Sequence, residues 1–251
     1  MIKYDNVTKD TLSLYTYFNY QNLIKSLLFR KQDYVHLIVS ENSAMILWGP
    51  SIFIGGEFSQ SISESFMSLL QNSDTPRYIY LPDGEWDSFI KRSYPNQLRD
   101  KQLNLYEADS IGDLNFQTNS QYIVPITKTL IERNLPNTQL ITNELYSYLN
   151  TEDFFQNGFG LALVIDDTVY GYCLSEYSID NGCGINIWVD ENYRGLGYAK
   201  MMTNLFLIHC HKRKWKAFWA CNSDNTPSNK VALSSGLVLN STLHYFEWEN
   251  F

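Results

Sequence analysis

The segment YRGLGYAK, Tyr193–Lys200, has the composition of a loop that binds phosphate. It follows the apolar run GINIWV and precedes MMTNLFLIHCH, whose apolar residues recur at helical spacing. Gly195 and Gly197 let successive backbone N–H groups turn toward one ligand, and the small Ala199 lets the following helix approach closely. Those N–H groups, together with the positive end of the helix dipole, favour a pyrophosphate.

Three kinds of phosphate loop compete for this segment, of which one fails and a second fits poorly. A Walker A loop needs G-x-x-x-x-G-K-[ST], whereas here Lys200 is followed by Met201 and the glycines are two apart. A dinucleotide fingerprint needs a third glycine where Lys200 stands, and it opens a βαβ unit rather than following an antiparallel hairpin. The pattern R-x-x-G-x-A, formed by Arg194, Gly197 and Ala199, remains. A tight strand-to-helix turn without a ligand is the alternative.

The elements around this loop follow from hydrophobic periodicity and turn residues. Beyond a set of short helices, the sequence predicts a fixed order, β-β-β-α-β-α-β. Its members are expected at residues 159–166, 169–178, 182–190, 199–215, 217–222, 227–235 and 243–250. If the strand expected at 182–190 separates from its neighbour after Val189, its backbone groups become available to an extended ligand that adds to the sheet edge.

The first half of the chain also alternates between helix-like and strand-like segments. Helices are expected at 14–31, 59–72 and 85–94, and strands at 34–40, 44–49, 77–84 and 102–108. No repeat of fixed period and no functional motif is found there. A polar stretch at 115–121 without periodicity predicts a boundary between a smaller α/β domain of unassigned role, 1–118, and a domain containing the loop, 119–251.

Composition narrows the function classes. The net charge of −8 argues against binding of nucleic acid, which depends on Lys and Arg. No apolar run approaches the roughly 20 residues of a membrane span, and no signal leader is found, so a cytoplasmic protein without membrane association is expected. The four cysteines form no C-x-x-C pair, and His209 and His211 lie two apart, so no metal site is expected.

Residues 153–236 resemble the GNAT superfamily of acyl-CoA-dependent N-acetyltransferases. In that family an R/Q-x-x-G-x-G/A loop binds the pyrophosphate of coenzyme A, after a strand whose backbone pairs with the pantetheine arm. The stretch WVDENYRGLGYA has the same layout, with Arg194, Gly197 and Ala199 at the motif positions.

A second match lies downstream of the loop. Family members often have an Asn after the fifth strand, a small residue three positions later, and a Gly before an apolar residue eleven positions later. Asn225, Ser228, Gly236 and Leu237 stand at those offsets. The resemblance therefore covers roughly the C-terminal half, and the longer chain resembles a GNAT subgroup that has an extra N-terminal α/β region.

The resemblance implies the fold and the coenzyme site. The class is α/β (α+β), a GNAT fold with a mixed central sheet, antiparallel first strands and flanking helices, preceded by a smaller α/β domain. Acetyl-CoA is the implied co-substrate. The residues expected to bind it are Ile187, Trp188, Val189, Arg194, Gly195, Leu196, Gly197, Tyr198, Ala199, Asn225 and Ser228. For Trp188 the backbone is expected to bind, while the side chain packs in the core.

Acetyl transfer to an amine needs a base that removes a proton from the ammonium group. The candidate is Glu176, on the strand YCLSEYS, because central-strand carboxylates of many family members face the acceptor. An exposed strand residue without a role is the alternative for Glu176, and Asp224 is another candidate base. Cys221 fits an acyl-enzyme nucleophile less well than a buried, inert thiol.

The acid that protonates the leaving sulfur departs from the family pattern. Many members have a tyrosine seven residues after the conserved Asn, and here that position is Ala232. Tyr193, Tyr198 and Tyr245 remain as substitutes, of which Tyr245 is kept as the candidate acid, although packing is the commoner role of a tyrosine.

The leading hypothesis is an N-acetyltransferase that moves an acetyl group from acetyl-CoA to a primary amine by direct attack in a ternary complex. The acceptor is a small molecule or a peptide amine, and a homodimer is left open. The alternative is a catalytically weak acyl-CoA-binding sensor or interaction module on the same fold, which the missing tyrosine at Ala232 supports. A nucleotide-binding enzyme is the third hypothesis.

Overall fold

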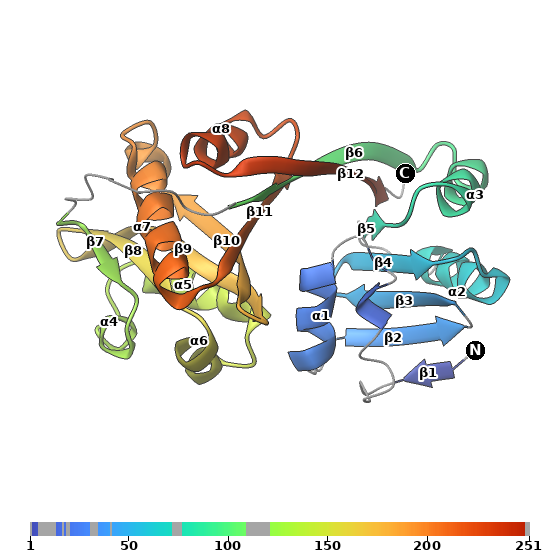
Figure 1. Ribbon diagram of the computed structural model, residues 1–251, viewed down its shortest axis with the longest axis horizontal. Coiled ribbons are helices and arrows are strands. Elements are labelled where there is room, and N and C mark those ends of the chain that lie inside the picture. Colours follow the sequence, from blue (N-terminus) through green and yellow to red (C-terminus); the bar gives the residue numbers. More distant parts are fainter. Residues whose placement is uncertain are drawn as a thin grey trace. The chain divides into compact units, whose positions relative to one another are not determined.

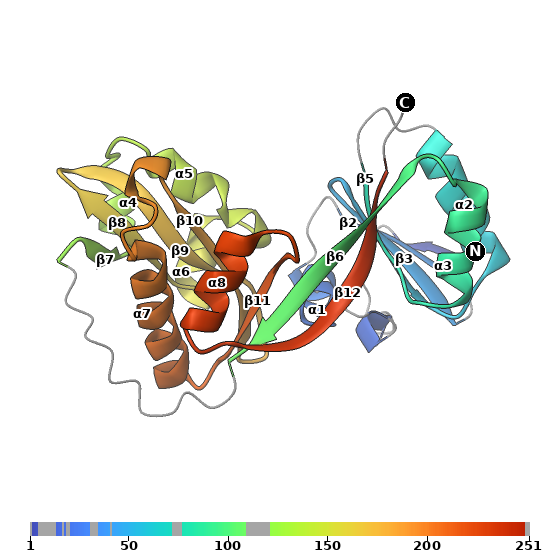
Figure 2. The same ribbon diagram turned by 90° about the horizontal axis from the view of Figure 1, so that it is seen from above.

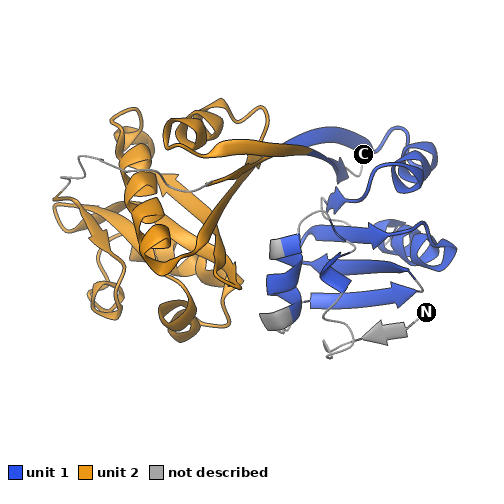
Figure 3. Cartoon of the chain, in the orientation of Figure 1, with its two compact units in different colours: residues 1–103, 243–251 blue, residues 104–242 orange. Residues whose placement is uncertain are grey.

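The computed structural model describes residues 2–4, 14–16, 18, 21–30, 35–40, 42–71, 77–108 and 121–248 (Figure 1). The chain forms two compact units, residues 1–103 with 243–251, and residues 104–242 (Figure 3). It enters the second unit within β6 (Leu98–Glu107) and leaves it within β12 (Val238–Trp248). The boundary predicted between 118 and 119 falls in 109–120, outside the described residues, and stays a prediction.

The first unit is a sheet with helices inserted between its strands. Its strand order is β1-β2-β3-β4-β5-β12, and every neighbouring pair is antiparallel except the parallel pair β4–β5. The elements are β1 (Ile2–Tyr4), α1 (Gln21–Arg30), β2 (Val35–Ser40), β3 (Ser43–Trp48), β4 (Ser51–Gly56), α2 (Gln60–Gln71), β5 (Arg77–Tyr80) and α3 (Glu85–Ser93). The strand β4 was missed in the sequence.

The core of the first unit lies between this sheet and the helices α2 and α3. Ile62, Phe66 and Leu70 recur every four residues on α2, so they share one helix face, and all three are buried. Trp86 and Ile90 likewise lie four residues apart on α3 and are buried. These side chains pack with apolar residues of the strands, among them Phe246 and Trp248 of β12.

The second unit contains the glycine loop within Tyr193–Lys200. Its elements before the loop are β7 (Ile123–Pro125), α4 (Lys128–Glu132), α5 (Thr138–Asn143), η2 (Leu145–Ser147), α6 (Thr151–Asn157), β8 (Gly160–Ile165), β9 (Thr168–Ile179) and β10 (Gly182–Val189). After β10 come η3 (Glu191–Tyr193), α7 (Tyr198–Arg213), β11 (Lys216–Asn222) and α8 (Thr226–Ser234). From β8 to β12 the predicted order β-β-β-α-β-α-β is confirmed.

Helices cover both faces of the sheet in the second unit (Figures 1 and 2). The helix α7 packs on one face, where Met202, Phe206 and Cys210 meet Cys173 of β9. The segment α4–α6 packs on the other face, where Leu174 of β9 belongs to a separate apolar cluster. Cys173 and Leu174 point to opposite faces because side chains alternate along a strand.

The two units have the same order of elements, although the sequence contains no repeat of fixed period. Each begins with a strand, continues through one or more helices to three antiparallel strands, and then has helix, strand, helix and strand. Each also has a parallel pair, β4–β5 in the first unit and β10–β11 in the second. The last strand of the second series, β12, does not stay in the second unit. Its C-terminal part pairs with β5 inside the first unit.

The structure also bears on the cysteines, on metal binding and on membrane-spanning helices. All four cysteines are buried and free of disulfides. In the part of the chain that the structure describes, no group of three or more His, Cys, Asp or Glu side chains is arranged so that it could hold a metal ion. Among those same residues, none of the helices has both the length and the apolar composition for crossing a bilayer.

Candidate active site

The loop between β10 and α7 is shaped by two glycines with left-handed backbones. Gly195 has φ +76° and Gly197 has φ +86°, conformations that residues with a Cβ rarely adopt. Asp190 accepts a hydrogen bond from the backbone N–H of Asn192 at 3.0 Å and so caps the turn η3. The Nε of Arg194 donates to the carbonyl oxygen of Val189 at 3.0 Å, which closes the loop back onto the strand.

The helix α7 starts with exposed amide donors. Gly197 is its N-cap residue, and no side chain accepts a hydrogen bond there. The first turn contains no acidic residue, and Ala199 lies half-buried against the core of the unit. The positive end of a 16-residue helix is therefore available to an anion beside the exposed residues Arg194, Gly195 and Leu196.

The strands β10 and β11 separate before they reach this loop. Their parallel ladder spans only Gly182–Gly184 and Lys216–Phe218. The strand β10 continues to Val189, still paired with β9 on its other side. The separation therefore begins at Gly184, five residues before the predicted point at Val189, and leaves a longer edge along Ile187, Trp188 and Val189.

The two downstream motif residues hold the start of α8. Asn225 is the N-cap residue of α8, and its Oδ1 accepts a hydrogen bond from the N–H of Ser228 at 3.2 Å. The Oγ of Ser228 accepts from Nε1 of Trp219 on β11 at 3.1 Å. These contacts explain why the pair has this spacing, and binding of coenzyme by Asn225 and Ser228 stays a prediction.

The sequence did not single out Asn229, which holds the loop between β11 and α8. Its Nδ2 donates to the carbonyl oxygens of Asn222 and Asn225, at 3.0 and 2.8 Å. Its Oδ1 accepts hydrogen bonds from Asn104 and from the hydroxyl of Tyr106, both on β6. No sequence signal marks this residue, since its partners on β6 are more than a hundred positions away.

The candidate base Glu176 lies half-buried in the middle of the sheet, opposite Gly184 of β10. A Cβ at position 184 would lie 2.8 Å from Cγ of Glu176 and 3.1 Å from its Oε1, so the glycine makes room for this side chain. Burial, and secondly the nearby negative charge of Glu144, raise the pKa of Glu176 to about 7. A carboxyl with that pKa is suited to proton transfer near neutral pH.

A β-bulge follows Glu176 directly. Glu176 pairs with Gly184 and Ile179 pairs with Gly182, so Tyr177 and Ser178 together oppose the single residue Cys183. Tyr177 has φ +48°, which is uncommon for a residue other than glycine. Bulges of this kind re-aim side chains and are enriched next to active sites.

The hydroxyl of Tyr148 braces the bulge. It shares hydrogen bonds with Oγ of Ser175 at 2.7 Å and with Oγ of Ser178 at 2.8 Å, one residue on each side of the Glu176–Tyr177 pair. Because Tyr148 directly follows η2, these bonds hold the segment α5–η2 against β9. That segment carries Glu144, a residue that the sequence analysis did not single out.

The structure places the tyrosine candidates in different surroundings. Tyr198 begins α7 and lies near Tyr193, with 6.3 Å between ring centroids. Tyr245 lies in the first unit, where it is buried and stacked on Tyr80 at 5.1 Å. Ala232, at the family's tyrosine position, is fully buried in the core of the second unit. A role for Tyr245 as the acid stays a prediction.

Comparisons with known proteins identify the family of the chain. A family model described as GNAT acetyltransferase matches residues 20–246, so it includes the first unit, to which the sequence motifs assigned nothing. The chain belongs to the GNAT acetyltransferase family and is accordingly an acyltransferase. The search of curated proteins returned no match.

Solved structures share the fold across nearly the whole chain. A GCN5-related N-acetyltransferase-like protein from Streptococcus suis 89/1591 is 19% identical, with a TM-score of 0.66 over 96% of this chain and 98% of that one. A GNAT-family acetyltransferase from Colwellia psychrerythraea is 10% identical, with a TM-score of 0.60 over 97% and 96%. A tandem GNAT protein from the clavulanic acid biosynthesis pathway is 12% identical, with a TM-score of 0.56 over 96% of both chains.

Proposed function

We propose that this chain is an N-acetyltransferase that transfers the acetyl group of acetyl-CoA to a primary amine by direct attack in a ternary complex. The observation that carries the proposal is the edge of β10 beyond its ladder with β11, which leads into a glycine loop and an uncapped helix start. The extended pantetheine arm pairs with the backbone of Ile187, Trp188 and Val189, in the manner of an added strand. The pyrophosphate binds at residues 194–199.

Acetyl-CoA, when bound, supplies the acetyl group as a thioester. The carboxylate of Glu176 accepts a proton from the acceptor ammonium, and its pKa of about 7 leaves a large ionised fraction at neutral pH. The free nitrogen forms the new N–C bond while the C–S bond breaks, and the leaving sulfur takes up a proton. Tyr245, the candidate donor that the sequence suggests, is buried beside Tyr80 in the first unit, so we expect its part in this step to be small.

The proposal is tested by measuring coenzyme binding and turnover separately. Calorimetry should give a saturable dissociation constant for coenzyme A. Incubation with acetyl-CoA and a panel of primary amines should release free thiol and form the acetylated amine in equal amounts. Absence of coenzyme A binding would overturn the proposal.

An acyl-CoA-binding sensor is the second candidate function. It is favoured by Ala232, because a fully buried alanine stands where many family members have a catalytic tyrosine. Tight binding of coenzyme A without thiol release from any amine would support the sensor. Protection against heating by NAD or ATP, with none from coenzyme A, would support the third hypothesis, a nucleotide-binding enzyme.

A further inference from the structure

A carboxylate–aromatic cluster lies around Glu176 on the sheet face that α4–α6 cover. In the ladder of β9 and β10, Tyr172 lies opposite Trp188 and Glu176 lies opposite Gly184. The two pairs are four positions apart on each strand, an even offset, so their side chains share one face. The rings of Tyr172 and Trp188 stack with 5.9 Å between centroids. The members of this cluster are Glu144, Tyr146, Tyr172, Glu176, Asn186 and Trp188.

The cluster holds two carboxyl groups and, among the described residues, no basic partner for either. The charge of Glu144 is the main cause, after burial, that raises the pKa of Glu176, so the two carboxyl groups lie within electrostatic reach of each other. The Oε2 of Glu144 accepts a hydrogen bond from Nδ2 of Asn186 at 2.9 Å, which fixes its direction on the sheet. Two such groups in a half-buried position favour a bound cation.

A second observation points to a ligand. Tyr172 is only 6% exposed, and its hydroxyl makes no hydrogen bond with any described residue. After burial, the charges of Glu144, Tyr146 and Glu176 raise its pKa, so the hydroxyl lies within electrostatic reach of both carboxyl groups. The hydroxyl of this largely buried side chain keeps its hydrogen-bonding capacity free, and a polar group of a ligand at this point would use it.

We propose that the carboxylate–aromatic cluster binds the acceptor amine and selects primary alkylammonium groups that carry no carboxylate next to the nitrogen. This inference rests on the proposed function. Glu144 holds the ammonium group while Glu176 removes its proton. The faces of Tyr172 and Trp188 contact the adjacent methylene groups and add a cation–π attraction. An α-carboxylate on the acceptor meets the two negative side chains and is repelled.

The test compares phenethylamine with phenylalanine, which differ only in the α-carboxylate. We expect kcat/KM for phenethylamine to be at least about tenfold higher, because removing the repulsion is worth one or more factors of ten. Glu144→Gln should raise KM for phenethylamine about tenfold, change kcat little and reduce the preference between the two amines. Glu144→Asp, which keeps the charge, should restore part of the affinity.

Glu132→Gln is the matched control, since it makes the same charge change at an exposed position on α4. It should leave both KM values and the dissociation constant of coenzyme A unchanged. Glu144→Gln should also leave coenzyme A binding unchanged, because the residue lies on the acceptor side.

The outcomes separate this inference from the proposed function. Equal kcat/KM values for the two amines would overturn the inference and leave the acetyltransferase intact. If neither amine is acetylated, calorimetry with each amine decides instead, with and without coenzyme A. Tighter binding of phenethylamine that is lost in Glu144→Gln supports the site, and equal or absent binding overturns it. Failure to bind coenzyme A would count against the proposed function alone.

Discussion

The two units share an order of elements but differ at the junction that the family uses for coenzyme binding. In the first unit, three residues, 57–59, connect β4 to α2, while residues 190–197 connect β10 to α7 in the second. The Oγ of Ser59 lies 3.5 Å from the N–H of Ile62 and accepts its hydrogen bond, so the start of α2 is capped by its own chain. The acidic Glu57 precedes it. The features that we propose to bind a pyrophosphate therefore occur at only one of these two junctions.

The difference extends to the last residue with which β10 and β4 take part in the parallel ladders. On β10 of the second unit this residue is Gly184, with Glu176 opposite it on β9. On β4 of the first unit it is Phe53, with Ile46 opposite it on β3, and both are buried. The ring of Phe53 stacks on Tyr80 at 4.8 Å. The same position thus holds buried apolar side chains in one unit and, in the other, a glycine that accommodates a candidate base.

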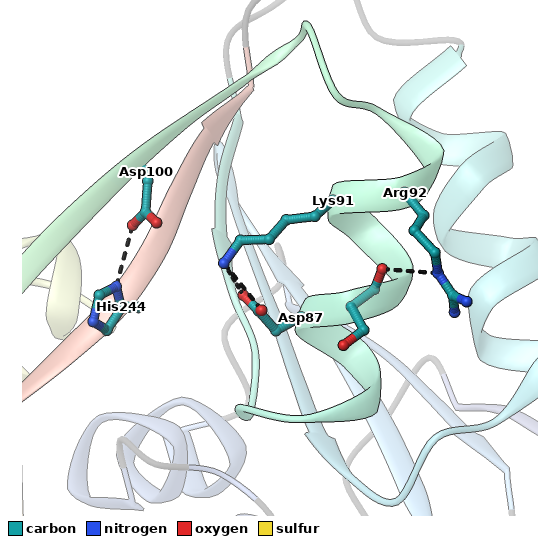
Figure 4. Close-up of polar contacts among 6 residues, drawn as sticks. Asp87, Lys91, Arg92, Asp100 and His244 are labelled. Atoms are coloured by element: carbon teal, nitrogen blue, oxygen red, sulfur yellow. Dashed lines mark hydrogen bonds and ion pairs between the residues drawn. The ribbon is translucent and has the colours of Figure 1, made fainter.

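Charged groups are also arranged differently. In the first unit, Lys91 pairs with Asp87 at 2.9 Å and His244 pairs with Asp100 at 3.2 Å, all at partly exposed positions (Figure 4). Surface pairs of this kind contribute about 0–1 kcal/mol. In the second unit, Glu176 is half-buried and no described basic residue pairs with it. The comparison indicates that a shared fold does not imply a shared site.

The largest expected effect comes from Gly197→Trp. The position has φ +86° and open space around it, so the indole would fill the region proposed for the pyrophosphate. We expect affinity for coenzyme A to fall at least about a hundredfold, since the helix amides become inaccessible. The backbone strain itself costs about 1–3 kcal/mol of stability. Calorimetry with coenzyme A measures the first effect and thermal unfolding the second.

Gly49→Trp is the control in the first unit. Gly49 has φ +54° and equally open surroundings, so the same strain and bulk are introduced away from the loop. Coenzyme A affinity should stay within about twofold. If both variants lose affinity to the same degree, the contrast between the units is wrong.

The second largest effect is expected for Glu176→Gln. Loss of a general base lowers kcat by about a hundredfold or more, and the acidic limb of the rate profile, which should centre near pH 7, disappears. Coenzyme A affinity should not change. Glu64→Gln, an exposed position on α2, serves as the control and should leave the profile intact. A variant that keeps both the rate and the limb would remove Glu176 from the mechanism.

The same variant tests the pKa through stability. Folding raises the pKa of Glu176 from 4.5 to about 7, so the folded protein binds this proton more tightly than the unfolded chain. The stabilisation from that proton is complete below pH 4.5 and is lost as the pH rises through about 7. Glu176→Gln does not titrate and should therefore gain stability relative to the wild type as the pH rises from about 5 to about 8.

A smaller effect is expected for Gly184→Ala. The new Cβ would contact Cγ and Oε1 of Glu176 and displace the carboxyl group, and the flexible side chain moves at little cost to the fold. We expect kcat to fall about tenfold with unchanged coenzyme A affinity, since a misplaced base loses rate without loss of binding. Gly182→Ala, where the nearest atom belongs to the ring of Phe218, is the control on the same strand. Equal rates in both variants would show that Gly184 has no special relation to the base.

Local signals in the sequence predicted the loop and its surroundings well. The alternation of apolar residues predicted the strands β8 to β11, and Gly195 and Gly197 predicted a turn before the helix, because both signals depend on neighbouring residues. The bulge at Tyr177 could not be predicted, since no glycine marks its positive φ. Glu144 was missed because only the fold brings it near Glu176, and the exchange of β12 into the first unit is likewise a long-range pairing.

The smallest expected effect is that of Tyr245→Phe. Its ring is 3% exposed and lies between Tyr80, at 5.1 Å, and Tyr78, at 6.3 Å, inside the first unit, and phenylalanine keeps these ring contacts. We expect kcat to change less than about twofold, in contrast to Glu176→Gln in the second unit. Steady-state kinetics with the best amine of the panel measures this. A tenfold or larger fall in kcat with unchanged coenzyme A affinity would establish Tyr245 as the acid and would mean that both units contribute to the chemistry.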